Sequence, residues 1–150
     1  MSNNLQNIYR ETVLNHSRDP HNRGALPDAN RETLGFNPLC GDKLHIYIKL
    51  QNDRIDDIRF EGTGCAISIA SASMMTDALQ GQPLPKAIER IDHLQSLLNA
   101  GGASLETEIE ELHALEGVRD YPSRIKCATL AWTAAAAALQ GDNAEISTEK

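Results

Sequence analysis

The segment of residues 43–50 most constrains the fold, because its apolar side chains occupy every second position. Side chains two residues apart in a strand point to the same side, so this pattern predicts a strand with one buried face. A turn at residues 52–53 follows, and residues 55–60 predict a second strand with a bulge or irregularity near Asp56. The two segments together predict an antiparallel hairpin.

The register of this hairpin follows from the requirement that its apolar residues share one face. That requirement pairs Ile46 with Phe60 and, continued to the open end of the hairpin, brings Cys65 opposite residues 40–42. Cys40, Asp42 and Cys65 are therefore expected to be neighbours in space, although more than twenty residues of chain separate the first from the last.

The helical spacing of apolar residues, together with glycines at the ends of several segments, predicts that the remaining elements are helices. Cys65 is expected to open its helix, and Ser123 is expected to cap the last one. We expect solvated or capping roles for His16, His21, His93 and His113, and a surface position for His45. The predicted helices are residues 4–17, 65–81, 84–99, 105–115 and 123–141.

Length and charge exclude several classes of protein. The 150 residues fit one domain over 1–150, with about 1–3 and 142–150 frayed. A net charge of -7 argues against nucleic-acid binding. No apolar run is long enough for a membrane helix, and the first residues do not resemble a secretory signal, so we expect no membrane association and a cytoplasmic protein with reduced thiols.

The three cysteines are the candidate functional residues. Cys40, Cys65 and Cys127 form no Cys-x-x-Cys motif, and each falls at the edge of a predicted element. A thiol near a helix N-terminus is more readily ionised, which favours metal binding or attack on sulfur. Buried packing is an equally supported interpretation, because free cysteine often only fills space. With Asp42 the set offers three sulfurs and one oxygen, a match for tetrahedral zinc, whereas the motifs of hydrolytic zinc sites are absent.

Three blocks of sequence around these cysteines resemble the U-type iron–sulfur cluster assembly proteins, the IscU/NifU N-terminal-like family. The blocks are NPLCGD at 37–42, GTGCAIS with ASASMM at 62–75, and RIKCATLAW at 124–132, and residues 15–24 resemble the N-terminal block. Lys126 stands where the general scaffold branch has histidine, and the scaffold's Leu-Pro-Pro-Val-Lys segment is missing. These differences and the long segment 82–119 resemble the SufU branch.

The resemblance implies an α+β fold, in which a small antiparallel sheet of about three strands packs against several helices. It implies a zinc site of Cys40, Asp42, Cys65 and Cys127, with Cys40 as the acceptor of persulfide sulfur from a cysteine desulfurase of the SUF type. Downstream iron–sulfur assembly or acceptor proteins are the other implied partners. The protein would then be a sulfurtransferase-like acceptor.

Two alternatives remain open. The same cysteines could hold a [2Fe-2S] cluster in a scaffold protein, or the site could be a structural zinc module that only docks partners. Three thiolates and a carboxylate around Zn²⁺ carry a net charge of -2, so we expect Arg124 and Lys126 to moderate the site.

Overall fold

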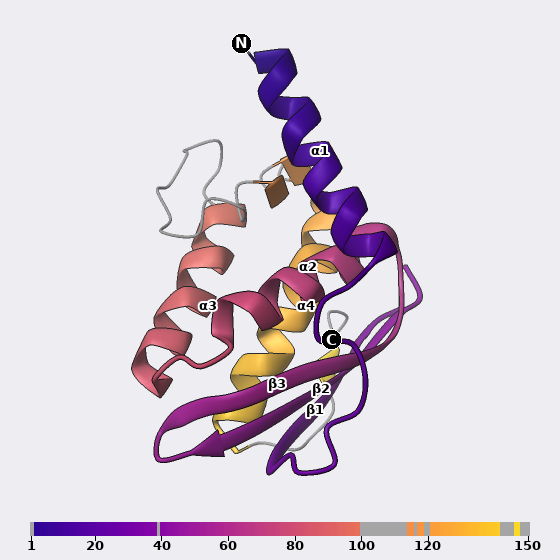
Figure 1. Ribbon diagram of the computed structural model, residues 1–150. Helices are drawn as coiled ribbons and strands as arrows, with labels where there is room; N and C mark the ends of the chain where they lie inside the picture. The colour runs from indigo at the N-terminus through magenta and orange to yellow at the C-terminus, as the bar shows by residue number, and fades with distance from the viewer. Residues whose placement is uncertain are drawn as a thin grey trace.

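The computed structural model describes residues 2–38, 40–99, 114–115, 117–118, 121–141 and 146–147, and it describes only the backbone of residues 2–9 and 146–147. A sheet forms one layer, and the helices α2, α3 and α4 lie over one of its faces (Figure 1). The elements are α1 (Ser2–Arg18), β1 (Arg31–Asn37), β2 (Asp42–Gln51), β3 (Arg54–Thr63), α2 (Ala66–Leu79), α3 (Leu84–Leu98), α4 (Pro122–Leu139) and β4 (Ile146–Ser147).

The strand order is β3-β2-β1-β4, with antiparallel pairing among β1, β2 and β3 and parallel pairing of the two-residue β4 with β1. The predicted hairpin is confirmed as β2 and β3, and Ile46 pairs with Phe60 as expected. The register shifts between Lys49 and Leu50, which leaves Asp56 as the extra residue of a bulge. The α+β prediction is therefore confirmed, down to the register of its central strands.

No sequence pattern predicted strand β1. Its buried face consists of Thr33, Gly35 and Asn37, which are small or polar, so no apolar alternation marks it. A Cβ on Gly35 would lie 3.1 Å from Leu130 of α4, so glycine lets this helix approach the strand closely. The polar face of β1 also contributes to the candidate site, because the side chain of Asn37 at its end lies beside Cys127.

Helix α4 packs against β1, β2, α2 and α3. Its alanines and the fully buried Trp132 face these neighbours, and the Trp132 indole donates a hydrogen bond to Ser71 Oγ of α2 at 2.9 Å. The expectation that Ser123 caps α4 was wrong: the helix begins at Pro122, with Tyr121 at the cap position and no side-chain cap. Proline suits this first position, because its missing N–H would have no helical partner there.

The other predicted helices match α1, α2 and α3 within a few residues at each end. Cys65 is the N-cap of α2, as predicted, and Gly81 follows that helix with a positive φ of 76°. The helix predicted over 105–115 lies outside the described residues except for its last two positions. No helix among the described residues has the length and apolar character required to cross a membrane.

Candidate metal centre

Two chain connections meet at one end of the sheet and bring the predicted ligands together. The β1–β2 connection carries Cys40 and leads directly into Asp42, the first residue of β2. At the same end β3 passes through Cys65 into α2. Cys127 enters from the second turn of α4. The hairpin register thus explains why residues distant in sequence share this place, as predicted for the first three.

Asp42 is the organising residue of this site, because both of its carboxylate oxygens accept hydrogen bonds. The backbone N–H of Cys65 donates to Oδ1 at 2.9 Å, and Asn37 Nδ2 donates to Oδ2 at 3.0 Å. The side chain is 2 % exposed. Each carboxylate oxygen keeps a further lone pair, so these bonds orient the group without using up its capacity as a ligand.

Asn37 is the site residue whose role sequence reasoning missed. It pairs with Asp42 across β1 and β2, is fully buried, and also donates a longer hydrogen bond from Nδ2 to Cys127 Sγ at 3.4 Å. The signal that could have identified Asn37 is its position at the end of a strand, directly opposite the predicted ligand Asp42. Asn37 therefore holds a carboxylate and a thiol in one orientation.

The thiols of Cys127 and Cys40 are in direct contact, with their Sγ atoms 3.3 Å apart. Cys127 is fully buried, and burial raises the pKa of its thiol, as do its hydrogen bonds with Cys40, Asp42 and Cys65. An isolated thiolate is poorly stabilised in such a place. Any negative charge on this group of side chains therefore favours a compensating cation.

Cys65 lies at the border of this group and is also the N-cap of α2. Its Sγ accepts a hydrogen bond from the backbone N–H of Ser68 at 3.4 Å and so caps α2. It is not part of the set of Cys40, Asp42 and Cys127, whose ligand atoms all lie within 4.8 Å of one another. The structure brings three of the four predicted ligands into one set and leaves Cys65 at its edge.

Charge and hydrogen-bonding capacity around the site fit a bound cation. In tetrahedral zinc sites the ligand atoms lie about 3.5 Å apart, close to the spacing of the two contacting thiols. Ser68, fully buried in the first turn of α2, has a hydroxyl without a hydrogen-bond partner among the described residues. A thiolate or another bound group nearby would give that hydroxyl an acceptor. The donor set of sulfur and carboxylate oxygen suits Zn²⁺ in chemistry and in size.

Arg124 supplies positive charge from the first turn of α4. Its pKa is raised, first by a hydrogen bond with Cys127 and then by the charges of Cys65, Cys127 and Cys40. The guanidinium therefore lies beside the thiols, as expected from the sequence, and on the exposed side of them. The corresponding role of Lys126 stays a prediction.

The described histidines lie away from this group, and one of them differs from expectation. His16 is only 4 % exposed and bonds through Nδ1 to Ser73 Oγ at 2.7 Å, so a solvated or capping role for it was wrong. It is buried because the last turns of α1 pack against α2. His45 lies on the outer face of the sheet, as predicted, and contacts Glu32 at 2.8 Å.

Comparison with known proteins agrees with this arrangement. The model of the NifU-like N-terminal domain matches residues 8–128. The zinc-dependent sulfurtransferase SufU of Bacillus subtilis is 38% identical over 131 residues, which cover 87% of this chain and 88% of that protein. The iron–sulfur cluster assembly scaffold protein IscU of Streptococcus pyogenes is 40% identical over 130 residues, covering 87% of this chain and 81% of that protein.

A solved structure extends the likeness to three dimensions. The crystal structure of a Fervidobacterium islandicum protein, described as a candidate iron–sulfur cluster assembly scaffold for the SUF system, has a TM-score of 0.77 and 30% identity, and the match covers 86% of this chain and 94% of that one. Sequence, site geometry and fold therefore agree that this chain belongs to the NifU-like N-terminal domain family, which the resemblance of the three cysteine blocks had indicated.

Proposed function

We propose that this protein acts in iron–sulfur cluster assembly as a zinc-dependent acceptor of persulfide sulfur from a cysteine desulfurase. The observation that carries the proposal is the contact of two thiols with each other and of one of them with a carboxylate, at an end of the sheet that solvent reaches. The similarity to a zinc-dependent sulfurtransferase over most of both chains supports the same function.

Cys40, Asp42, Cys65 and Cys127 would hold the metal. Cys65 already hydrogen-bonds with Cys127, so its Sγ would only have to move closer to the other three ligands, and it could keep the hydrogen bond from the Ser68 amide. Zinc has no redox chemistry, so at this position it would stabilise thiolates against protonation and oxidation. Asp42 is a harder ligand than a fourth thiolate, and Asn37 and the Cys65 amide fix its orientation.

Cys40 is the acceptor in this proposal because of its position. It lies in the β1–β2 connection and is partly exposed, whereas Cys127 is fully buried and Cys65 is engaged as a helix cap. Gly41, next to Cys40, has a φ of 71°, a conformation that favours glycine. A thiol on a connection of this kind can reach a partner without disturbing the strands on either side.

The transfer itself is a thiol–disulfide type of exchange. The Cys40 thiolate attacks the outer sulfur of the desulfurase persulfide and forms a new S–S bond. The S–S bond of the desulfurase persulfide breaks, and its electron pair leaves with the desulfurase cysteine as a thiolate. The sulfur is passed on without net oxidation or reduction, and Cys40 then carries the persulfide for a downstream assembly or acceptor protein.

Arg124 has a defined part in this scheme. Its exposed guanidinium, beside the three thiols, would offset their negative charge and attract an anionic persulfide. The chemistry also requires free thiols, which agrees with a cytoplasmic protein.

A cluster scaffold is the second candidate function, favoured by relatives whose names describe them as scaffolds. In that case Cys40, Cys65 and Cys127 would hold a [2Fe-2S] cluster. Zinc and iron would then compete for the same side chains, so the two functions predict different metal contents.

The test is sulfur transfer in vitro from a SUF-type cysteine desulfurase supplied with cysteine. We expect the intact protein, purified without oxygen, to retain about one zinc per chain and to gain the mass of sulfur on Cys40. Cys40→Ala should abolish this gain, and Arg124→Gln should slow it. Full transfer to Cys40→Ala would refute the role of that thiol. Loss of zinc with equal gain of iron and acid-labile sulfide would favour the scaffold.

A further inference from the structure

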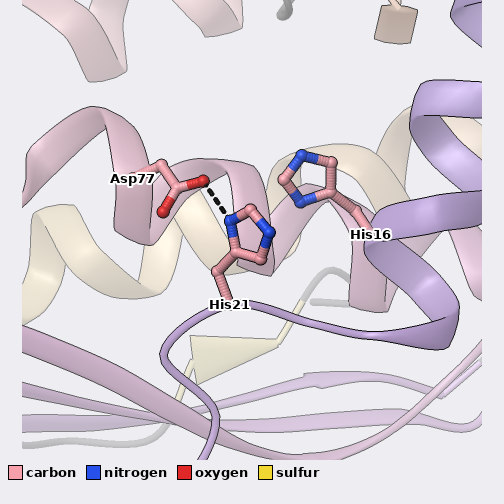
Figure 2. A group of neighbouring side chains, drawn as sticks. All are labelled: His16, His21 and Asp77. Carbon is pink, nitrogen blue, oxygen red and sulfur yellow. Dashed lines mark hydrogen bonds and ion pairs between the residues drawn. The ribbon is translucent and has the colours of Figure 1, made fainter.

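A second group of metal-ligating side chains lies outside the cysteine site, where α1 meets α2. It consists of His16 in α1, His21 in the segment that follows α1, and Asp77 in α2 (Figure 2). One ligand atom from each of them lies within 4.8 Å of those from the other two. Asp77 is twelve residues beyond Cys65 on the same helix, about 18 Å along its axis, so this is a separate place in the fold.

We propose that His16, His21 and Asp77 form a second site for a divalent transition metal, with Zn²⁺ as the ion that its donors suit. Two imidazole nitrogens and a carboxylate oxygen are common ligands of this ion. The three side chains come from three separate segments of the chain. A bound ion would therefore join the end of α1 to α2.

The His21 imidazole and the Asp77 carboxylate are already in contact, as two ligands of one ion would be. Nδ1 of His21 lies 2.6 Å from Asp77 Oδ2, and a carboxylate can only accept, so Nδ1 carries the proton while no metal is bound. An ion held by both groups would take the place of this proton between the two atoms, because metal ligands release their protons on binding. Figure 2 shows the His16 ring beside the His21 ring, so a second imidazole lies next to this pair.

The position of His16 is fixed by burial and by Ser73. The Ser73 hydroxyl contacts Nδ1 of His16 at 2.7 Å and accepts the backbone N–H of His21 at 2.8 Å. One hydroxyl thus holds both histidines, and their ring centroids are 4.6 Å apart. If Nδ1 of His16 is the ligand atom, metal binding exchanges its contact with Ser73 for a coordinate bond, while the His21 amide keeps its acceptor.

Access and charge are also suitable. The side chains of His21 and Asp77 are 54% and 40% exposed, so an ion can enter from solvent. Asn22 donates from Nδ2 to Asp77 Oδ1 at 3.3 Å and to Thr76 Oγ1 at 3.0 Å, which supports the second carboxylate oxygen. Asp77 with two neutral imidazoles carries one negative charge, which a divalent cation more than compensates. Ligand atoms around zinc lie about 3.4 Å apart, so the 2.6 Å contact of His21 with Asp77 must open slightly, a movement that the exposed His21 can supply.

The experiment uses the full chain without a histidine tag, first loaded with one equivalent of Zn²⁺ and then titrated with Co²⁺. We expect a further equivalent of Co²⁺ to bind with ligand-field absorption but without the sulfur-to-cobalt charge-transfer band of a thiolate site. His21→Ala should abolish this signal, and Asp77→Asn, which replaces a charged ligand by a neutral one, should weaken binding by more than about 10-fold. His45→Ala is the matched control, because it removes a partly exposed histidine that also contacts a carboxylate.

A second measurement separates metal binding from simple structural support. Hydrogen exchange of the amides in residues 10–21 should slow when Zn²⁺ occupies the second site of the intact protein, and should not change with Zn²⁺ in His21→Ala. If the intact protein binds no second equivalent, or if His21→Ala binds it as tightly as His45→Ala does, the three side chains form only a hydrogen-bonded contact between α1 and α2, and the proposal fails. These readouts do not depend on sulfur transfer.

Discussion

Replacing Asn37 by alanine tests how the cysteine site is organised. The substitution removes the donor to Asp42 Oδ2 at 3.0 Å and the longer contact to Cys127 Sγ, both in a fully buried place. A hydrogen bond to a charged group contributes about 1.5–3 kcal/mol. Because the carboxylate must be ionised and correctly oriented to bind zinc, most of this energy is expected to appear as lost zinc affinity and the rest as lost folding stability.

At about 1.4 kcal/mol for each factor of ten, this energy corresponds to zinc binding that is weaker by about 10- to 150-fold. That range agrees with the effect of removing partners of metal ligands in other proteins, about 10- to 100-fold. The assay is competition for zinc between the protein and a chromophoric chelator, made on the intact protein and on Asn37→Ala under the same conditions. Urea unfolding of the metal-free proteins measures the part that belongs to stability.

The matched control is Thr33→Val. Thr33 lies on the same buried face of β1, four residues before Asn37, and pairs with Ile46 in the middle of the sheet. Its substitution should reduce stability without changing zinc affinity. Equal zinc affinities for Asn37→Ala and the intact protein, within about twofold, would refute the reasoning that Asn37 orients the carboxylate.

Three further predictions follow from contacts described for individual side chains. In Gly64→Ala the new Cβ would lie 2.6 Å from Asp42 Oδ1, so zinc affinity in the chelator assay should fall; unchanged affinity would mean that the carboxylate can move freely. Trp132→Phe removes the donor to Ser71 Oγ and should lower the free energy of unfolding by about 1–3 kcal/mol in urea, whereas no loss would contradict the hydrogen bond. The pKa of Tyr47 is raised to about 12, first by its hydrogen bond to Glu61 and then by burial and nearby carboxylates. The protonated tyrosine therefore stabilises the folded state below about pH 10, and this contribution to stability is lost as the pH rises toward 12. In Glu61→Gln, ultraviolet titration should show Tyr47 ionising at lower pH, and an unchanged titration would exclude Glu61 as the cause.

The central hairpin could be predicted because strict alternation allows only one register that buries its apolar side. The pairing of Ile46 with Phe60 and the bulge at Asp56 both follow from that condition. Strand β1 could not be found in the same way, since its buried residues are Thr33, Gly35 and Asn37. Its position depends on contacts with α4 and β2, which are distant in sequence and leave no local pattern.

The sequence predicted that Cys40, Asp42 and Cys65 lie at one end of the hairpin, but it did not show how the side chains of the candidate site are arranged. The register brought Cys40, Asp42 and Cys65 together, but only the packing of α4 determines that Cys127 contacts Cys40. The hydrogen bonds of Asn37 depend on side-chain geometry that a single sequence does not contain. His16 shows the same limit, because its burial results from the way α1 packs on α2.

The contact between Cys40 and Cys127 affects the conformational entropy of the chain, because it joins two points that are far apart in sequence. The two residues are 87 positions apart, and Asp42 and Cys65 are 23 apart. A bond that joins points 87 residues apart, whether through a shared ion or directly, restricts the unfolded chain by about 4 to 5 kcal/mol of conformational entropy. A metal held at this site would therefore act as a cross-link that encloses most of the fold, and the release of Cys40 in the proposed sulfur transfer would open the largest loop that this cross-link closes.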